Sequence, residues 1–224
     1  MNRVETAVSR SSAGLLSTHR VLRNTYALLA MTLLFSAVCA GASMLLNLPY
    51  PGLLVTLVGY FGLFYLVNRF SDRAMGLLFL FLLTGFMGAT LGPILNAYLG
   101  HYANGGELVA MALGGTGLTF LGLSGYALAT RKDFSFLGGM LGAGILVAFL
   151  AAIVAVFFPE MIGLSMAVSV MFVLLMSGMI LYQTSAIIHG GETNYILATL
   201  SLYVSIYNLF TSLLQLFGVL EGED

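Results

Sequence analysis

The chain has 224 residues, of which 59% are hydrophobic and 8% are charged, and its mean hydropathy is +1.00. Soluble domains carry about 25% charged residues, so this composition excludes an ordinary soluble fold. Eight Lys and Arg against nine Asp and Glu give a net charge of −1, which leaves no basic field for binding nucleic acid. Because Cys39 is the single cysteine, we expect neither a disulfide framework nor a cysteine-ligated metal site.

Uncharged apolar stretches predict seven membrane-spanning helices, since a spanning helix needs about 20 mostly apolar residues. A turn-forming segment with two prolines, residues 47–52, separates the first two spans. The third span contains Gly92-Pro93, where we expect a kink or a break. The expected spans are residues 26–46, 52–68, 75–99, 107–130, 134–157, 161–188 and 196–217.

These spans predict an all-α integral membrane protein that folds as a seven-transmembrane-helix bundle. The expected organisation is an N-terminal tail at 1–23, a transmembrane domain at 24–218 and a short acidic C-terminal end at 219–224. The short connections leave no room for a soluble domain.

The positions of Lys and Arg predict the orientation of the bundle. All eight lie on one side of the expected membrane, in the tail and after the second and fourth spans. By the positive-inside rule the N-terminus is cytoplasmic, and seven spans place the C-terminus outside. A cleaved signal peptide is the alternative for the first span, because Ala-Gly-Ala at 40–42 resembles a cleavage site. The apolar run from Tyr26 to Leu48 exceeds the roughly 7 to 15 residues of such a segment, which favours an uncleaved helix.

No complete catalytic or metal centre can be assembled from these residues. The segment 122–125, Gly-Leu-Ser-Gly, matches the G-x-S-G of rhomboid intramembrane proteases, but that chemistry needs a histidine in another span. His19, His101 and His189 fall in the tail, an outer loop and a span end. We therefore expect close helix packing at 122–125, no enzyme, no cofactor and no metal site.

Glycines spaced by four residues predict a tight bundle. The pairs Gly88/Gly92 and Gly138/Gly142 place small residues on one helix face, which lets helix backbones approach closely in lipid. This pattern does not distinguish a channel from an interaction protein.

The last span carries a polar stripe. Its members are spaced 4, 3, 4 and 3 residues apart, which places them on one helix face. Such a face cannot meet lipid without unsatisfied polar groups, so we expect it to face the bundle interior. Interhelical hydrogen bonding is one interpretation, and a hydrated path or ion site is the other. The stripe consists of Ser201, Ser205, Asn208, Ser212 and Gln215.

Several motifs resemble those of the Bax inhibitor-1 family, and most closely its bacterial branch of FtsH protease modulators. The resemblance covers nearly the whole chain, and Gly-Pro-Ile-Leu at 92–95 and Thr-Arg-Lys-Asp at 130–133 are its specific parts. One departure is Gly117, where many members have alanine. The matching segments are 15–26, 84–96, 111–116, 130–141, 187–195 and 201–210.

The resemblance implies a fold of six helices around a central seventh. It also implies a possible cation or proton leak, because one branch of the family opens and closes through two aspartates that share a proton. Those positions fall on Gln183 and Ser205 in this sequence. Neither side chain titrates near neutral pH, so a carboxylate dyad cannot form, which disfavours a leak channel as the alternative function.

The resemblance further implies an integral protein of the bacterial inner membrane that binds the membrane-bound AAA protease FtsH. It would restrain degradation of membrane proteins such as SecY while being a slow substrate itself, with the C-terminus in the periplasm. The tail, with Arg3, Arg10 and Arg20, is the expected protease-engaging segment. Fully extended, roughly 20 residues reach about 70 Å. The small polar segment 9–14 is typical of disorder. The alternative is a tail that only fixes the topology.

Overall fold

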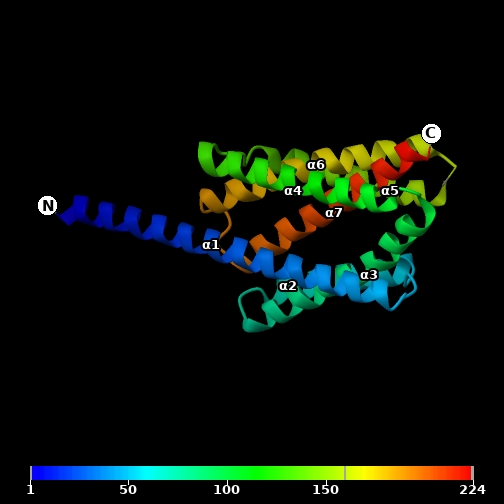
Figure 1. Ribbon diagram of the computed structural model, residues 1–224. Coiled ribbons are helices and arrows are strands. Elements are labelled where there is room, and N and C mark those ends of the chain that lie inside the picture. The colour runs from blue at the N-terminus through cyan, green and yellow to red at the C-terminus, as the bar shows by residue number, and fades with distance from the viewer. Residues whose placement is uncertain (1, 159, 223–224) are drawn as a thin grey trace.

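Seven helices account for nearly all of the chain in the computed structural model (Figure 1). The structure describes residues 2–158 and 160–222, with side chains described from Thr18 onward. All seven helices are long and apolar enough to cross a membrane, and no strand occurs in the described residues. The predicted all-α membrane bundle is therefore confirmed. The helices are α1 (Asn2–Leu45), α2 (Leu53–Phe70), α3 (Ala74–His101), α4 (Gly105–Thr130), α5 (Leu137–Phe157), α6 (Ile162–Ile188) and α7 (Tyr195–Glu221).

The breaks between helices follow the turn-forming residues. Asn47 and Gly52 both have positive φ, at 48° and 87°, in the segment that separates α1 from α2. Helix α3, in contrast, continues through Pro93 without a break, as transmembrane helices tolerate when neighbours satisfy the backbone. The bounds of α1 also include residues 9–14, where the composition indicates disorder.

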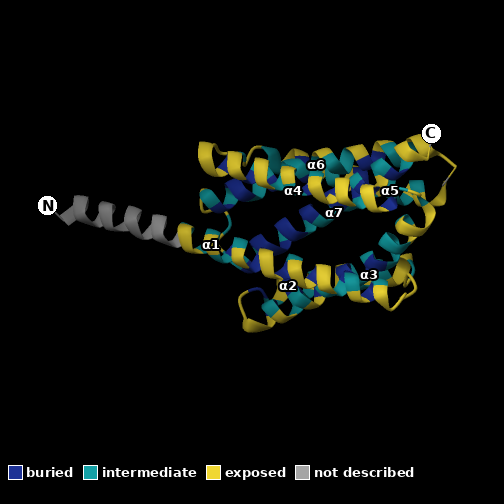
Figure 2. Cartoon of the chain, viewed as in Figure 1, coloured by how far each residue is buried: buried dark blue, intermediate teal, exposed yellow. Residues whose placement is uncertain are grey.

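Helix α7 lies between two groups of helices, with α1, α2 and α3 on one side and α4, α5 and α6 on the other (Figure 1). It is the most buried helix: 61% of its apolar window is buried, against at most 39% in any other helix. Figure 2 shows it as the dark central element. Helix α5 packs on α6 and not on α7, so one side of the central helix is left without a neighbouring backbone.

Loop contacts show which helix ends lie together. The Asn194 side chain donates to Asp72 Oδ1 at 3.1 Å, which joins the α6–α7 loop to the α2–α3 loop. A ring nitrogen of His189 lies 3.1 Å from the Arg131 carbonyl oxygen, which adds the α4–α5 loop to the same end. The Thr199 hydroxyl, near the start of α7, lies 3.3 Å from the Thr25 carbonyl oxygen on α1.

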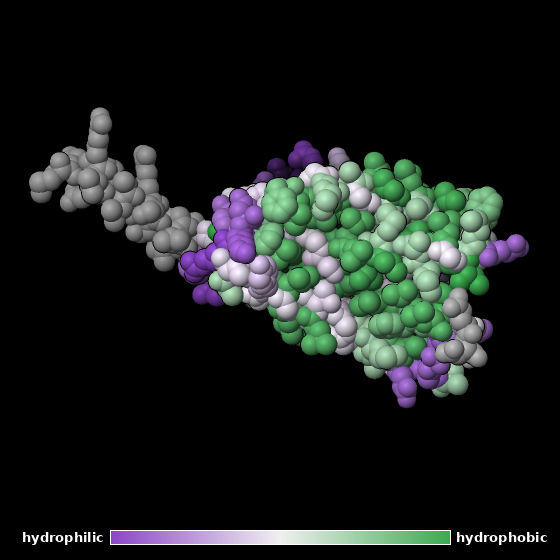
Figure 3. Space-filling view, turned by 90° about the horizontal axis from the view of Figure 1, so that it is seen from above, coloured by the Kyte–Doolittle hydropathy of each residue, from purple (hydrophilic) through white to green (hydrophobic). Residues whose placement is uncertain are grey.

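This end of the bundle, which we call the basic end, holds every described Lys and Arg. Figure 3 shows hydrophilic residues gathered towards the two ends of the molecule and hydrophobic ones between them. Such a distribution is that of a bundle whose middle lies in hydrocarbon. All of the cationic side chains are exposed: Arg20, Arg23, Arg69, Arg73, Arg131 and Lys132.

The predicted close packing at glycines holds for α3. A Cβ on Gly88 would collide with the Ser36 carbonyl oxygen of α1, and one on Gly92 would lie 2.6 Å from Ser43 Cβ. On α5, a Cβ on Gly138 would lie 3.1 Å from the Tyr182 ring, and one on Gly144 would lie 2.6 Å from Leu175 Cδ2. A Cβ on Gly142 would meet nothing within 4 Å, so this glycine borders open space and departs from the expected packing role.

Candidate functional site: a cavity beside the central helix

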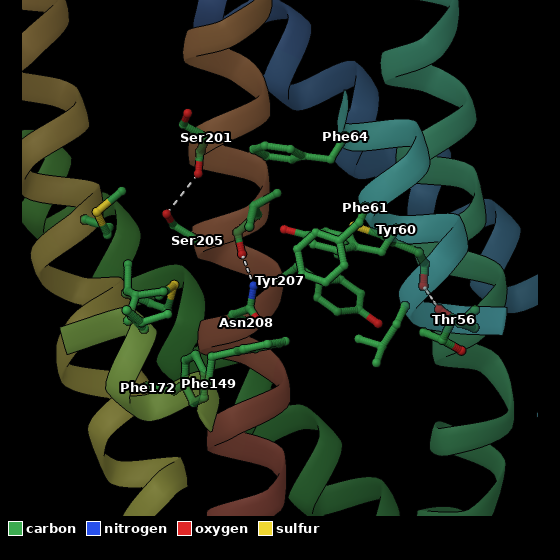
Figure 4. Close-up of a pocket in the computed structure, with 18 of the residues that line it drawn as sticks. Thr56, Tyr60, Phe61, Phe64, Phe149, Phe172, Ser201, Ser205, Tyr207 and Asn208 are labelled. Atoms are coloured by element: carbon green, nitrogen blue, oxygen red, sulfur yellow. Dashed lines mark hydrogen bonds between the residues drawn. The ribbon is translucent and has the colours of Figure 1, made fainter. Parts of the chain in front are cut away.

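A cavity of about 630 Å³ lies between α2, α5 and α7, and residues of α3 and α6 also line it. This volume lies within the roughly 300 to 1,000 Å³ typical of small-molecule sites. Figure 4 shows the aromatic side chains of α2 on one side, Phe149 and Phe172 on the other, and polar side chains of α7 between them.

Three of the five residues of the predicted polar stripe line this cavity, namely Ser201, Ser205 and Asn208. Ser212 is buried but is not among the lining residues. Gln215 departs from the expected interior position, because its side chain is exposed and its Nε2 donates to Ser165 Oγ at 2.6 Å. A stripe of period 3.5 drifts by about 20° per heptad on a straight helix, so its far end turns away from the face where it begins.

The polar groups at the cavity bond to their own helices. Ser205 Oγ donates to the Ser201 carbonyl oxygen at 2.9 Å, and Asn208 Nδ2 donates to the Val204 carbonyl oxygen at 2.8 Å (Figure 4). Thr56 and Thr90 likewise donate to backbone carbonyls one turn earlier, each at 2.9 Å. The donors of Ser205 and Asn208 are therefore satisfied within α7, whereas Gln215 outside the cavity bonds to α6.

The chemistry of the walls does not favour an ion path. None of the residues that line the cavity carries a charge, and most are aliphatic or aromatic. Dehydrating a cation requires converging oxygen ligands or acidic side chains. The oxygens present are dispersed hydroxyls and one amide, and the hydroxyls of Thr56, Thr90 and Ser205 are already bonded to a helix backbone.

The two positions of the family's aspartate pair are not joined here. Ser205 is buried at the cavity, with 2% of its surface exposed. Gln183 is half-buried near the end of α6, is not a lining residue, and makes no hydrogen bond to Ser205. The geometry thus agrees with the residue types in offering no shared proton.

A second cluster of hydrogen bonds lies at the basic end, and no sequence pattern other than the resemblance indicates it. Ser185 Oγ of α6 accepts from the Phe134 backbone N–H at 2.9 Å and donates to the Lys132 carbonyl oxygen at 3.1 Å. His189 Nδ1 lies 2.9 Å from the Ser185 carbonyl oxygen. Because His189 also contacts the Arg131 carbonyl oxygen, two of the matching segments, 130–141 and 187–195, meet in space, and Ser185 fastens the α4–α5 loop to α6.

The Asp133 carboxylate in this loop bonds to Ser135 within the same turn. The hydroxyl and then the backbone N–H of Ser135 bond to the Asp133 carboxylate, which lowers the pKa of that carboxyl below its usual value. The nearby His189 acts in the same direction. Because Asp133 is fully exposed, solvent screens this effect, and the turn itself is the structural consequence.

The remaining candidate residues do not assemble into a catalytic centre. Ser124 is buried, with its Oγ 3.4 Å from Thr184 Oγ1 across the α4–α6 contact. Among the residues that the structure describes, no three metal-binding side chains lie close together. In the predicted protease-engaging tail, Arg20 is exposed, whereas the side chains of Arg3 and Arg10 lie outside the described residues.

Comparison with known proteins agrees with this architecture. The family described as inhibitor of apoptosis-promoting Bax1 matches residues 18–222. An Escherichia coli K12 protein named modulator of FtsH protease YccA is 56% identical over 210 residues, which cover 94% of each chain. An uncharacterised protein of Pseudomonas aeruginosa is 58% identical over 204 residues, or 91% of each chain.

More distant relatives extend along the same length. A Vibrio cholerae protein described as an uncharacterised membrane protein is 43% identical over 210 residues, covering 93% of each chain. The matched residues 18–222 include all seven membrane-spanning segments and both hydrogen-bonded regions described above. The chain belongs to the Bax inhibitor-1 family.

Proposed function

We propose that this protein is a regulatory protein of the bacterial inner membrane that restrains the FtsH protease. The observation that carries this proposal is the 56% identity, over 94% of both chains, to the relative named modulator of FtsH protease. A second strain's copy of that relative is named an inner membrane protein, which supports the location. That relative is named as a modulator of a protease, which supports a non-enzymatic role.

The proposed orientation places the basic end in the cytoplasm. Six exposed cationic side chains lie there, and Lys and Arg are retained on the cytoplasmic side of membrane proteins. The N-terminal tail, with Arg3, Arg10 and Arg20, would then reach the side on which an ATP-driven protease works. The C-terminus would be periplasmic.

The tail and the basic end would have different roles in this proposal. The tail is the segment that the protease engages, since an accessible chain end is where proteolysis starts. The fastened loops of the basic end, held by Ser185 and by the Asn194–Asp72 bond, resist such engagement. A protein that has an accessible tail but unfolds slowly would occupy the protease and be degraded slowly.

The test is an affinity purification from membranes in mild detergent, with FtsH probed directly and the half-life of SecY followed in the same cells. We expect co-purification with FtsH and a longer SecY half-life when this protein is overproduced. If FtsH does not co-purify and the SecY half-life does not change, the proposal is contradicted. An overproduced seven-helix membrane protein of another family is the control for general crowding of the membrane.

A tail variant tests the division of roles. Deleting residues 1–14 should slow the protein's own loss and increase its protection of SecY, while Arg20 and Arg23 keep the positive-inside charge. A tail with the same residues in shuffled order is the matched control. Unchanged turnover after the deletion would remove the tail from the mechanism and leave only the basic end.

A further inference from the structure

The cavity beside α7 opens sideways, between α2 and α5. The backbones of these two helices are not in contact, and residues on both rims are exposed to the surroundings of the bundle. Phe61 of α2 is 49% exposed and Leu146 of α5 is 60% exposed, yet both line the cavity. A side chain that is at once lining and exposed marks the rim of an opening.

One aromatic pair spans the opening. The rings of Phe61 and Phe149 lie edge to face with centroids 5.9 Å apart. Rings on rotatable side chains can swing aside without moving a helix, so the pair can admit a flexible chain at little cost.

The depth of the cavity restricts what can enter it. Most of its lining residues fall around the middle of the spanning helices, for example Met176 in α6 and Asn208 in α7, whereas Thr56 lies near the start of α2. A lipid headgroup stays at the membrane surface, about 15 Å away if the hydrocarbon core is about 30 Å thick. The part of a lipid present at this depth is its acyl chain.

The cavity could be empty, filled with water or filled with an acyl chain, and the chemistry of its walls distinguishes these three cases. Left empty, the apolar walls would lose their dispersion contacts, which is unfavourable in proportion to the void. Water needs two to four polar partners. The donors of Ser205, Asn208 and Thr56 are already bound to backbone carbonyls, and the other lining hydroxyls, of Tyr60, Ser201 and Tyr207, stand among mostly apolar walls. An acyl chain needs only apolar walls, and the bilayer supplies it at the opening.

We propose that this cavity is a binding site for one acyl chain of a membrane lipid, admitted between α2 and α5 past the Phe61–Phe149 pair. The chain lies along the Ser201, Ser205 and Asn208 face of α7 and supplies the packing that α5 does not give to the central helix. This site is independent of FtsH modulation, so the two proposals fail separately.

The experiment uses the purified full-length protein in liposomes that contain a phospholipid with a photoreactive diazirine in the middle of one acyl chain. After irradiation, labelled residues are mapped by mass spectrometry. Exposed residues such as Leu150 report the ordinary lipid annulus. Ser205 and Met176 are 2% and 3% exposed, so only a chain inside the cavity can label them.

Two glycine variants form a matched pair. Gly142 lines the cavity and a Cβ there meets nothing within 4 Å, so Gly142→Leu places a side chain in the void. Gly139, three residues earlier on α5, is equally unobstructed but lies outside the cavity. We expect Gly142→Leu to reduce labelling of Ser205 and Met176 about tenfold, which corresponds to about 1.4 kcal/mol, and Gly139→Leu to leave it unchanged.

Two results would overturn the proposal: labelling confined to exposed residues, or equal labelling of the buried pair in wild type and Gly142→Leu. A second measurement covers the case in which Gly142→Leu fails to fold. In a Cys39→Ala background, Ser205→Cys is treated with a charged, water-soluble thiol reagent. A chain-filled cavity predicts no reaction, whereas rapid modification would show a hydrated path and refute the site.

Discussion

The two sides of α7 use similar polar groups in opposite ways. On one side, Tyr203 is 1% exposed, its hydroxyl lies 2.6 Å from Ser36 Oγ of α1, and it donates to the Thr84 carbonyl oxygen of α3 at 3.3 Å. On the other side, Ser205 and Asn208 donate to carbonyls of α7 itself. On the first side, which we call the closed side, hydrogen bonds link α7 to α1 and α3. On the other side, which we call the cavity side, α7 borders the cavity.

This difference shows that a polar stripe on a membrane helix does not by itself indicate a polar environment. Serine and asparagine can satisfy their donors on the preceding turn of their own helix, and then tolerate an apolar neighbour. A tyrosine hydroxyl is too far from its own backbone to do this, so it must find a partner on another helix. Short side chains can also join helices where the backbones lie close, since Ser43 of α1 donates to the Ala89 carbonyl oxygen of α3 at 2.8 Å.

Adding one methyl group on each side of α7 should give the largest difference in the free energy of unfolding between the two sides. Gly88→Ala would push a Cβ against the Ser36 backbone on the closed side, and we expect it to lower the free energy of unfolding by about 3 kcal/mol. Gly142→Ala enters open space and should raise it by up to about 1 kcal/mol, because alanine favours the helix. Unfolding in mixed detergent and SDS micelles, followed by circular dichroism, measures both. Equal effects would contradict the contrast.

Removing the tyrosine hydroxyl should have the next largest effect. Tyr203→Phe deletes both bonds that this group makes, and we expect a loss of about 1.5 kcal/mol, near the upper end for hydrogen bonds between membrane helices. A double-mutant cycle with Ser36→Ala in the same unfolding measurement should give a coupling energy of at least about 0.5 kcal/mol. Strictly additive losses would mean that Tyr203 acts by packing alone.

Helix number, class and approximate ends follow from the sequence because charge and apolar length fix them. The gap between Leu45 and Leu53 is encoded by two prolines and a glycine, and the Gly88/Gly92 pair correctly indicates close packing. Gly138/Gly142 has the same spacing, yet Gly142 borders the cavity. Spacing places residues on one helix face but does not tell which neighbour, if any, covers that face.

The candidate site was less accessible to sequence reasoning for the same reason. The spacing of Ser201, Ser205 and Asn208 correctly predicts a common face, but the position of α5, whose backbone contacts only that of α6, decides that this face borders a cavity. Tyr203 lies between these residues in sequence and faces elsewhere. Its partner Ser36 is 167 residues away, and no local pattern connects them.

The N-terminal cap of α7 contributes to stability independently of the contacts on either side of the helix. Asn194 caps the helix by accepting from the backbone N–H groups of Ile196 and Leu197 at 2.9 and 3.4 Å. We expect Asn194→Ala to lower the free energy of unfolding by about 1 kcal/mol, and Asn194→Ser, which keeps a capping oxygen, to recover most of it. If serine fails to recover stability, the bond from Asn194 to Asp72 on the α2–α3 loop is the important one.

The smallest effect is expected on the cavity side. Ser205→Ala removes a hydroxyl that donates to the Ser201 carbonyl oxygen, an oxygen that lies within the α7 backbone ladder. Back-bonding of this kind contributes little to a helix, so the free energy of unfolding should change by less than about 0.5 kcal/mol. Loss of a partner in an interhelical network would instead cost about 1 to 3 kcal/mol, because the group left behind is buried and unsatisfied. The same unfolding measurement decides between these values: a small change keeps Ser205 as part of an apolar wall, and a large one would place it in a polar network and weaken the contrast between the two sides of α7.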